Sequence, residues 1–203
     1  MAIEITIDPA ELDEAMRRLD GIPYALQRAV YPAVSEVLQG VKDQLAEHIK
    51  SDVPLPDKIA KKAIKLSSPR LSNGTVIGEV TVGSATVPLI HYDVQPPEIT
   101  ARPGMRSKKW PGFTYALRTG ERRQSSDRTE GVGLPFIARM PTGHVGVYYR
   151  TPSQMKQAYG PTVQYHVATP EVEGKIVDQA NAAFPAILAR YVDQAIEAHG
   201  GEA

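Results

Sequence analysis

The hydrophobic residues of the chain follow the period of a strand at first and that of a helix soon afterwards. Apolar and polar residues alternate over residues 3–7, which indicates a strand with one buried face. Asp8 and Pro9 follow, and these residue types are preferred at a helix N-cap and at the first helical position. We therefore expect a short helix from Pro9 to about Gly21.

Two long amphipathic helices are predicted farther along the chain. Within residues 23–51, apolar side chains recur every three or four positions, at Leu26, Val30, Ala33, Val37, Val41, Leu45 and Ile49. Pro32 lies inside this pattern and predicts either a kink or a helix that begins at that residue. Thr169 is a suitable N-cap for a second helix, which extends to about residue 200 and bends at Pro185. The apolar positions of this second helix are Val172, Ile176, Ala180, Ala183, Ile187, Tyr191 and Ala195.

The segments between the long helices mostly have the period of strands. A short basic helix is expected over residues 58–66, followed by a strand over 75–84. Residues 87–92 either pair with that strand or pass along its edge. A hairpin is predicted over 136–150, and a loop over 151–168. The sequence thus predicts an α+β fold, in which a small antiparallel sheet packs against long N-terminal and C-terminal helices within a single domain of 203 residues.

An irregular segment, residues 95–133, is predicted as a long loop or insertion within this domain. Proline and glycine are frequent there, and one strand is expected over 113–118. Residues 119–133 have almost nothing to bury, so they form either a mobile loop or a segment that a partner orders. The segment contains a cluster of basic residues, namely Arg102, Arg106, Lys108, Lys109, Arg118, Arg122, Arg123 and Arg128.

This basic cluster is interleaved with aromatic residues, a combination that suits contact with the phosphates of DNA without sequence preference. The alternatives are a solvated loop or one that packs against an acidic neighbouring subunit. If the loop lines a DNA channel, neutralising Arg122, Arg123 and Arg128 should impair DNA retention and leave assembly intact.

Composition narrows the classes of protein to be considered. The chain has 23 Lys and Arg against 23 Asp and Glu, so only a local patch would attract a polyanion. Cysteine is absent, which excludes disulfides and thiolate metal sites. The first residues lack the pattern of a signal peptide, and no apolar run approaches the roughly 18 residues of a membrane span. We expect a soluble, unexported protein that makes no membrane contact.

The residues that usually carry catalysis or bind metals form no recognisable motif. None of the five histidines lies at metal-ligand spacing from another, and they are His48, His91, His144, His166 and His199. We do not assign His91 and Asp93 as a catalytic base with its orienting group, because no nucleophile or further acid or base accompanies them in a motif. There is no Gly-x-Ser-x-Gly motif and no phosphate-binding loop. We therefore expect no enzymatic activity, no metal and no cofactor.

Tyrosine and methionine residues gather after the predicted hairpin. They are Tyr148, Tyr149, Met155, Tyr159 and Tyr165. These residue types are enriched at the centres of protein interfaces, and they also fill cores. They are candidates for a contact between subunits, with burial in the chain's own core as the alternative.

Two motifs resemble those of a known family. The hairpin reads Phe-Ile-Ala-Arg-Met-x-x-Gly-His-x-Gly-Val-Tyr-x-Arg over residues 136–150, and residues 159–163 read Tyr-Gly-Pro-Thr-Val before the last helix. With the order of predicted elements, they are similar to the minor tail protein Z family of prophages, the tail-completion proteins of lambda-like phages. The resemblance is good over residues 134–200, fair over 24–66 and poor over 95–133.

The resemblance implies a structural subunit that acts late in tail assembly, in a ring that joins the tail tube to the filled head. A six-fold ring is implied, with copies of the chain and the adjoining tail and head–tail connector proteins as partners, and with packaged DNA as a non-specific one. The expected location is the neck or head-proximal tail end of the virion, and the host cytoplasm during assembly. The alternatives are a head-completion protein (adaptor or stopper), a tail-terminator protein, or a sequence-independent DNA-binding module.

Overall fold

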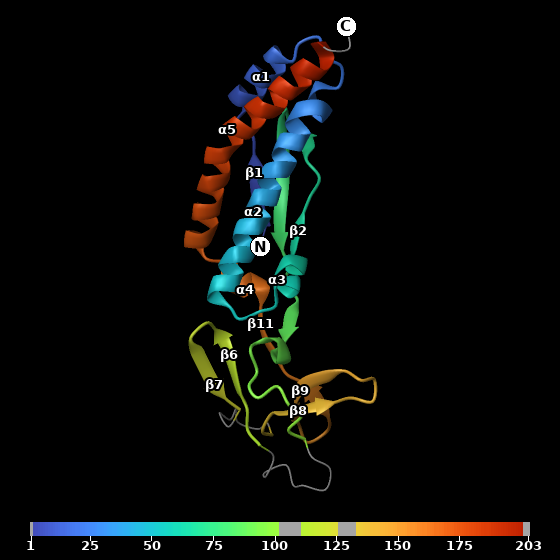
Figure 1. Cartoon of the computed structure of the whole chain (residues 1–203), viewed down its shortest axis with the longest axis vertical. Coiled ribbons are helices and arrows are strands. Elements are labelled where there is room, and N and C mark those ends of the chain that lie inside the picture. The colour runs from blue at the N-terminus through green and yellow to red at the C-terminus, as the bar shows by residue number, and fades with distance from the viewer. Residues whose placement is uncertain (1, 102–110, 126–132, 201–203) are drawn as a thin grey trace. The chain divides into compact units, whose positions relative to one another are not determined.

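The computed structural model describes residues 2–101, 111–125 and 133–200 (Figure 1). It has the α+β fold predicted from the sequence, with small antiparallel sheets and long helices near both ends of the chain. Its internal contacts divide it into two compact units. The first unit comprises Met1–Glu47, Lys61–Gly83 and Val167–Ala203, and the second comprises His48–Ala60 and Ser84–His166. The single folding domain expected from the sequence stays a prediction.

The sheet of the first unit is built around strand β4 (Thr75–Val82). Strand β1 (Ala2–Thr6), which the alternation over residues 3–7 predicted, pairs antiparallel with one edge of β4. The other edge of β4 pairs with β2 (Ile64–Leu66) and with β3 (Arg70–Ser72). Glu4, Thr6 and Thr81 are exposed, so one sheet face is polar, as in a sheet covered by helices on one side only.

The helix predicted over residues 58–66 is shorter than expected. Helix α3 (Asp57–Ala63) ends before Ile64, and the last three residues of the predicted helix form β2 instead. Ile64 is buried opposite Val82 in this pairing, so tertiary packing outweighs the local helical pattern.

The first long helix begins with a disturbed turn next to Pro32. A π-helical turn, η1 (Leu26–Val30), leads directly into α2 (Tyr31–Asp52), which places Pro32 in the first turn of the regular helix. Proline has no backbone N–H to donate, so the preceding turn cannot continue with regular α-helical bonds. The sequence predicted a disturbance at this position, and a wide turn followed by a regular helix is the form that it takes.

Helix α2 packs closely on the centre of the sheet, and Figure 1 shows it running along the strands. A Cβ atom added at Gly78 would lie only 2.8 Å from Val34 Cγ1 and 2.8 Å from Leu38 Cδ1. Val76 and Val80, the buried neighbours of Gly78 on the same face of β4, are fully enclosed. Burial of each such side chain contributes about 1.5–3 kcal/mol.

Helix α1 (Pro9–Arg18) and helix α5 (Pro170–Gly200) complete the first unit. The predicted N-caps are both present, because the backbone N–H of Ala10 donates to Asp8 Oδ1 at 2.8 Å and that of Val172 donates to Thr169 Oγ1 at 3.4 Å. Figure 1 shows that α5 bends midway, as Pro185 predicted.

The buried face of α5 differs from the predicted one in its second half. Ala183 is exposed and Ile187 is half-buried, whereas Phe184, Leu188 and Val192 are buried. The sequence offered two adjacent apolar rows, and the row with the larger side chains removes more apolar surface from water. The half-buried Tyr191 lies on the less buried row, and its hydroxyl donates to Glu36 Oε2 at 2.9 Å.

The second unit contains the predicted hairpin. Strands β8 (Phe136–Arg139) and β9 (Val145–Arg150) pair antiparallel, and Gly143 adopts the left-handed conformation (φ +83°) in the connecting turn. Strand β10 (Met155–Gln157) adds to β9 as a third strand. The sequence predicted a loop at this position. The three residues of β10 are exposed or half-buried, so they do not show the alternation of apolar residues by which a strand is recognised.

Two further parts of the second unit were not predicted. Strand β5 (Thr86–Pro88) pairs with β11 (Tyr159–Thr162), so the first of the two alternatives for residues 87–92, pairing with the strand over 75–84, is not the one that the structure shows. Helix α4 (Val163–Val167) follows β11 where a loop was expected. A short 3₁₀ turn, η2 (Leu89–His91), comes directly after β5. Within the described part of the chain, no helix has both the length and the apolar character needed to cross a membrane.

Candidate functional site

The described part of the basic segment forms a hairpin. Strand β6 (Thr114–Arg118) pairs with β7 (Glu121–Gln124), and Gly120 takes a left-handed conformation (φ +84°) between them. The strand β6 was predicted, but β7 lies where the sequence predicted a mobile loop or a segment that a partner orders. All four residues of β7 are exposed, so the strand lacks the buried apolar positions from which strands are recognised.

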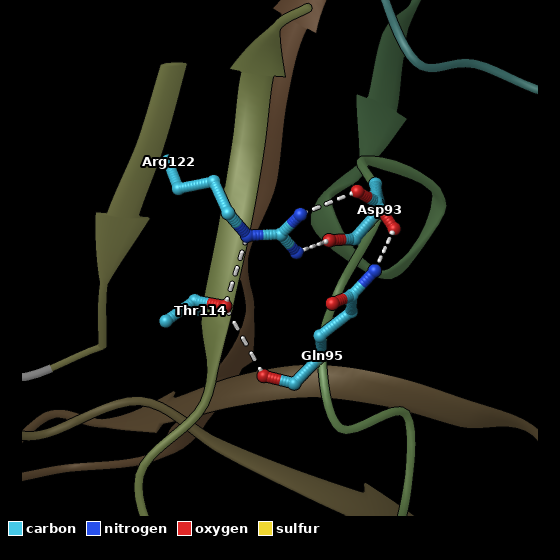
Figure 2. Close-up of polar contacts among 4 residues, drawn as sticks. All are labelled: Asp93, Gln95, Thr114 and Arg122. Atoms are coloured by element: carbon cyan, nitrogen blue, oxygen red, sulfur yellow. Dashed lines mark hydrogen bonds and ion pairs between the residues drawn. The ribbon is translucent and has the colours of Figure 1, made fainter. Parts of the chain in front are cut away.

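Arg122 anchors this hairpin to the chain segment beside it, as Figure 2 shows. Its Nη1 donates to Asp93 Oδ2 at 2.7 Å, and its Nη2 donates to the Asp93 backbone carbonyl at 2.9 Å. Its Nε donates to Thr114 Oγ1 at 3.2 Å. All three guanidinium nitrogens therefore donate to groups of the same chain, and two of these bonds hold a single residue in place.

Asp93 is fixed from a second side as well. Gln95 Nε2 donates to Asp93 Oδ1 at 2.9 Å, and the backbones of Gln95 and Thr114 exchange two hydrogen bonds. The hydrogen bond from Arg122, followed by that from Gln95, holds the pKa of the Asp93 carboxyl below its usual range. Asp93 has a positive φ of 42°, a conformation that short polar residues tolerate better than most. This cluster is a structural clasp between β6–β7 and residues 93–95.

The clasp changes which predicted DNA contacts are available. Arg122 forms an ion pair with Asp93, so its charge is already neutralised within the chain. Arg118 Nε lies 4.0 Å from Asp52 Oδ2. Arg123 is exposed and lies on the opposite hairpin face from Arg122, because successive residues of a strand alternate. It is directly opposite the half-buried Tyr115. The remaining predicted contacts lie outside the described residues, namely Arg102, Arg106, Lys108, Lys109 and Arg128.

The predicted interface residues separate into two groups. Tyr148 is only 6% exposed and packs with Phe136 and Ala138, with ring centroids of Tyr148 and Phe136 6.4 Å apart. Its expected interface role is therefore corrected to one in the core of its own chain. Tyr149 is half-buried. The other candidates expose large side chains, at 44% for Met155, 53% for Tyr159 and 64% for Tyr165.

The Tyr-Gly-Pro-Thr-Val motif encloses a residue that the sequence did not single out as structural. Tyr92 is fully buried, and its hydroxyl donates to the Pro161 carbonyl at 2.5 Å. A Cβ atom at Gly160 would lie 2.3 Å from the Cε2 atom of the Tyr92 ring, so only glycine fits there. Burial raises the pKa of Tyr92 to about 12. In this motif, Gly160 therefore leaves room for the ring of Tyr92, and Pro161 accepts the hydrogen bond from its hydroxyl.

One buried histidine lies in the second unit. His166 is 4% exposed, and neither of its ring nitrogens has a hydrogen-bond partner within the described residues. Its Nδ1 lies 4.0 Å from Asp52 Oδ2, and the ring of Tyr165 contacts it edge-on with centroids 5.4 Å apart. Burial lowers the pKa of His166, while Asp52 opposes this shift and Arg118 adds to it. The spacing of the histidines in the sequence gave no sign of this burial.

Within residues 2–101, 111–125 and 133–200, no three His, Asp or Glu side chains gather as a group that could hold a metal ion. Comparisons of the chain with protein-family models, with curated proteins and with solved structures found no match. The described chemistry of the second unit thus consists of an anchored hairpin with the outward Arg123, and of the exposed side chains of Met155, Tyr159 and Tyr165 farther along the chain.

Proposed function

We propose that the chain is a structural subunit of a bacteriophage neck or tail end, a ring-forming tail-completion protein that joins the tail tube to the head around the DNA channel. The observation that carries this proposal is the exposure of Met155, Tyr159 and Tyr165 beside the hairpin motif. Large apolar side chains of this kind are enriched in the centres of subunit contacts.

Energetics support an assembly role for these side chains. Covering apolar surface on association contributes about 25 cal/mol for each Å² removed from water. Aromatic residues also bury a large area at a small cost in side-chain entropy. Met155 lies on β10, which pairs with β9 on one side and ends the described sheet of the order β10-β9-β8. An exposed strand edge of this kind is available to a neighbouring subunit.

The structural roles of the two motifs also support the resemblance. Gly143 supplies the left-handed residue of the hairpin turn, and Gly160 leaves room for the ring of Tyr92. Both requirements concern backbone geometry. The motif residues that resemble the tail-completion family are thus residues that determine a fold, which suits a family defined by assembly.

The proposal is tested with the purified full-length chain. We expect sedimentation velocity to detect an oligomer that persists at high salt, and negative-stain electron microscopy to show rings. Labelling of the chain in virions should place it at the neck. A chain that is monomeric at every concentration, and that is found elsewhere in the particle, contradicts the proposal. Label at the head vertex on tailless heads would favour the head-completion alternative, and label on headless tails the tail-terminator alternative.

A sequence-independent DNA-binding module is the second candidate function. It is favoured by the exposed Arg123, which lies opposite the half-buried Tyr115 on the outer hairpin face. Such a pair can contact a phosphate and stack on a base. A DNA-binding module should lose affinity steeply as salt rises, whereas the contacts of an apolar subunit interface should not. A salt series of DNA binding and of self-association therefore separates the two functions.

A further inference from the structure

The first unit contains an apolar groove between helices α1 and α5. Its floor is formed by small and branched side chains, and Ala10, Ala15, Leu188 and Ala189 are among them. Its volume is about 360 Å³. At about 30 Å³ for each water molecule, this space suits an aromatic side chain. Ala10 is exposed at the groove and Ala189 is half-buried, so the groove is accessible from solvent.

The two helices that form the groove are joined beside it. Arg18 of α1 donates to Asp193 Oδ1 of α5 at 2.5 Å. A groove between two helices held in this way is preformed, and binding in it does not require the helices to separate. It can therefore receive a side chain at a small entropic cost.

A matching side chain stands on the same unit, in the turn between α1 and η1. Tyr24 is 74% exposed, the largest exposure among the large apolar side chains of the described residues. Its φ of +58° lies in the left-handed region that favours glycine. Strained backbone of this kind persists where it serves a function, and here it presents an aromatic ring to solvent.

The charges near the ring and near the groove are complementary. Arg28 lies one helical turn after Tyr24, is exposed, and its backbone N–H donates to the Tyr24 carbonyl at 3.0 Å. Glu11 and Glu14 line the groove, and Glu14 also pairs with Arg17 at 3.3 Å. The ring of Tyr24 thus suits the apolar groove, and the positive charge of Arg28 suits the carboxylates of Glu11 and Glu14 at its side.

We propose that Tyr24 of one copy of the chain inserts into the α1–α5 groove of the next copy, with Arg28 facing Glu11 and Glu14. The donor turn and the acceptor groove are different surfaces, so the contact can repeat head-to-tail from one copy to the next, and this repetition closes a ring if the rotation between copies permits. The inference rests on the proposed function, because it names the contact between subunits of the ring.

Two variants test the contact from its two sides. Tyr24→Gly removes the ring and suits the left-handed backbone, so the variant should fold. Ala10→Phe fills the groove from an exposed position. Sedimentation velocity should show at least tenfold weaker self-association for each variant, as expected for a central anchor. Thermal unfolding monitored by circular dichroism establishes that both remain folded.

Mixing the two variants gives the sharpest result. The Ala10→Phe chain keeps an intact Tyr24, and the Tyr24→Gly chain keeps an intact groove, so the mixture should form one-to-one heterodimers and stop there. Leu71→Ala is the matched control, since Leu71 is 52% exposed in the same unit and should leave self-association unchanged.

The outcomes separate this contact from the proposed function. Wild-type association by Tyr24→Gly, no heterodimer in the mixture, or an equal loss in Leu71→Ala overturns the Tyr24 contact, while a ring at the neck would still support the proposed function. A wild-type chain that never associates overturns both.

Discussion

The ring of Tyr92 lies against the backbone of Gly160, and its hydroxyl donates to the carbonyl of the next residue, Pro161. This contact joins the segment after β5 to β11, the strand with which β5 pairs. It combines close packing with a buried hydrogen bond, so the two requirements can be tested separately.

Gly160→Ala should destabilise the chain, because the new methyl group would lie 2.3 Å from the Tyr92 ring. Overpacking of this kind costs about 1–3 kcal/mol in the free energy of unfolding. Urea denaturation measures it. Gly40→Ala is the matched control, because nothing lies within 4 Å of a Cβ at Gly40 and its helical position should gain about 0.5–1 kcal/mol. A neutral Gly160→Ala would contradict the close approach.

Tyr92→Phe should reduce the loss of stability at high pH. Burial raises the pKa of Tyr92 to about 12, from 10.0. The folded chain therefore holds this proton more tightly, and the stabilisation is complete below pH 10 and is lost as the pH rises towards 12. The shift corresponds to roughly 3 kcal/mol. Thermal unfolding between these two pH values should show the loss in the wild type and a smaller one in Tyr92→Phe, and equal slopes would be evidence against it.

The buried His166 predicts the opposite behaviour in acid. Because burial lowers its pKa in the folded state, the unfolded chain binds the proton better, and stability falls as the pH drops below the ordinary histidine pKa of 6.5. Asp52 and Arg118 face His166 and partly offset each other. His166→Phe should flatten the dependence of unfolding free energy on pH between neutral and mildly acidic conditions. His199→Gln, an exposed control in α5, should follow the wild type.

Arg122 and Arg123 should differ although they are neighbours. Arg122→Ala leaves Asp93 without its ion pair and should lower stability by about 1 kcal/mol, since the pair is 38% and 37% exposed. Arg123→Ala should leave stability unchanged and weaken any DNA binding. Urea denaturation and a DNA-binding titration of both variants check this. An equal loss of stability in both variants would show that Arg122 has no special role in the hairpin.

The contrast between these two arginines shows what the sequence could predict. The cap at Asp8 and the turn at Gly143 were predictable, because each depends on residues within a few positions. The strand β7 was not, because its stability comes from β6 and from Asp93, which is 29 residues before Arg122. A count of basic residues cannot distinguish a cation held by the chain itself from one that faces outward.

The same limit applies to burial along regular elements. Periodicity located α5, and Pro185 located its bend. Two adjacent rows of apolar residues fitted the periodic pattern equally, and only packing selected Phe184 and Leu188. His166 and Tyr92 are buried by contacts between segments far apart in sequence, such as that of Tyr92 with Pro161. No local pattern marks such residues, so the sequence placed neither of them in the core.

Gly78 has a consequence for how the first unit can vary. Because Val34 and Leu38 already occupy the space that a side chain would need there, the separation of α2 from β4 is set by the absence of an atom. Helix α2 already contacts β4 at this point, so a larger residue at Gly78 would push the helix away from the strand. The packing of the neighbouring Val76 and Val80 would then loosen. Substitutions are therefore tolerated on the polar face of the sheet but not at Gly78, where the space for a side chain is already filled.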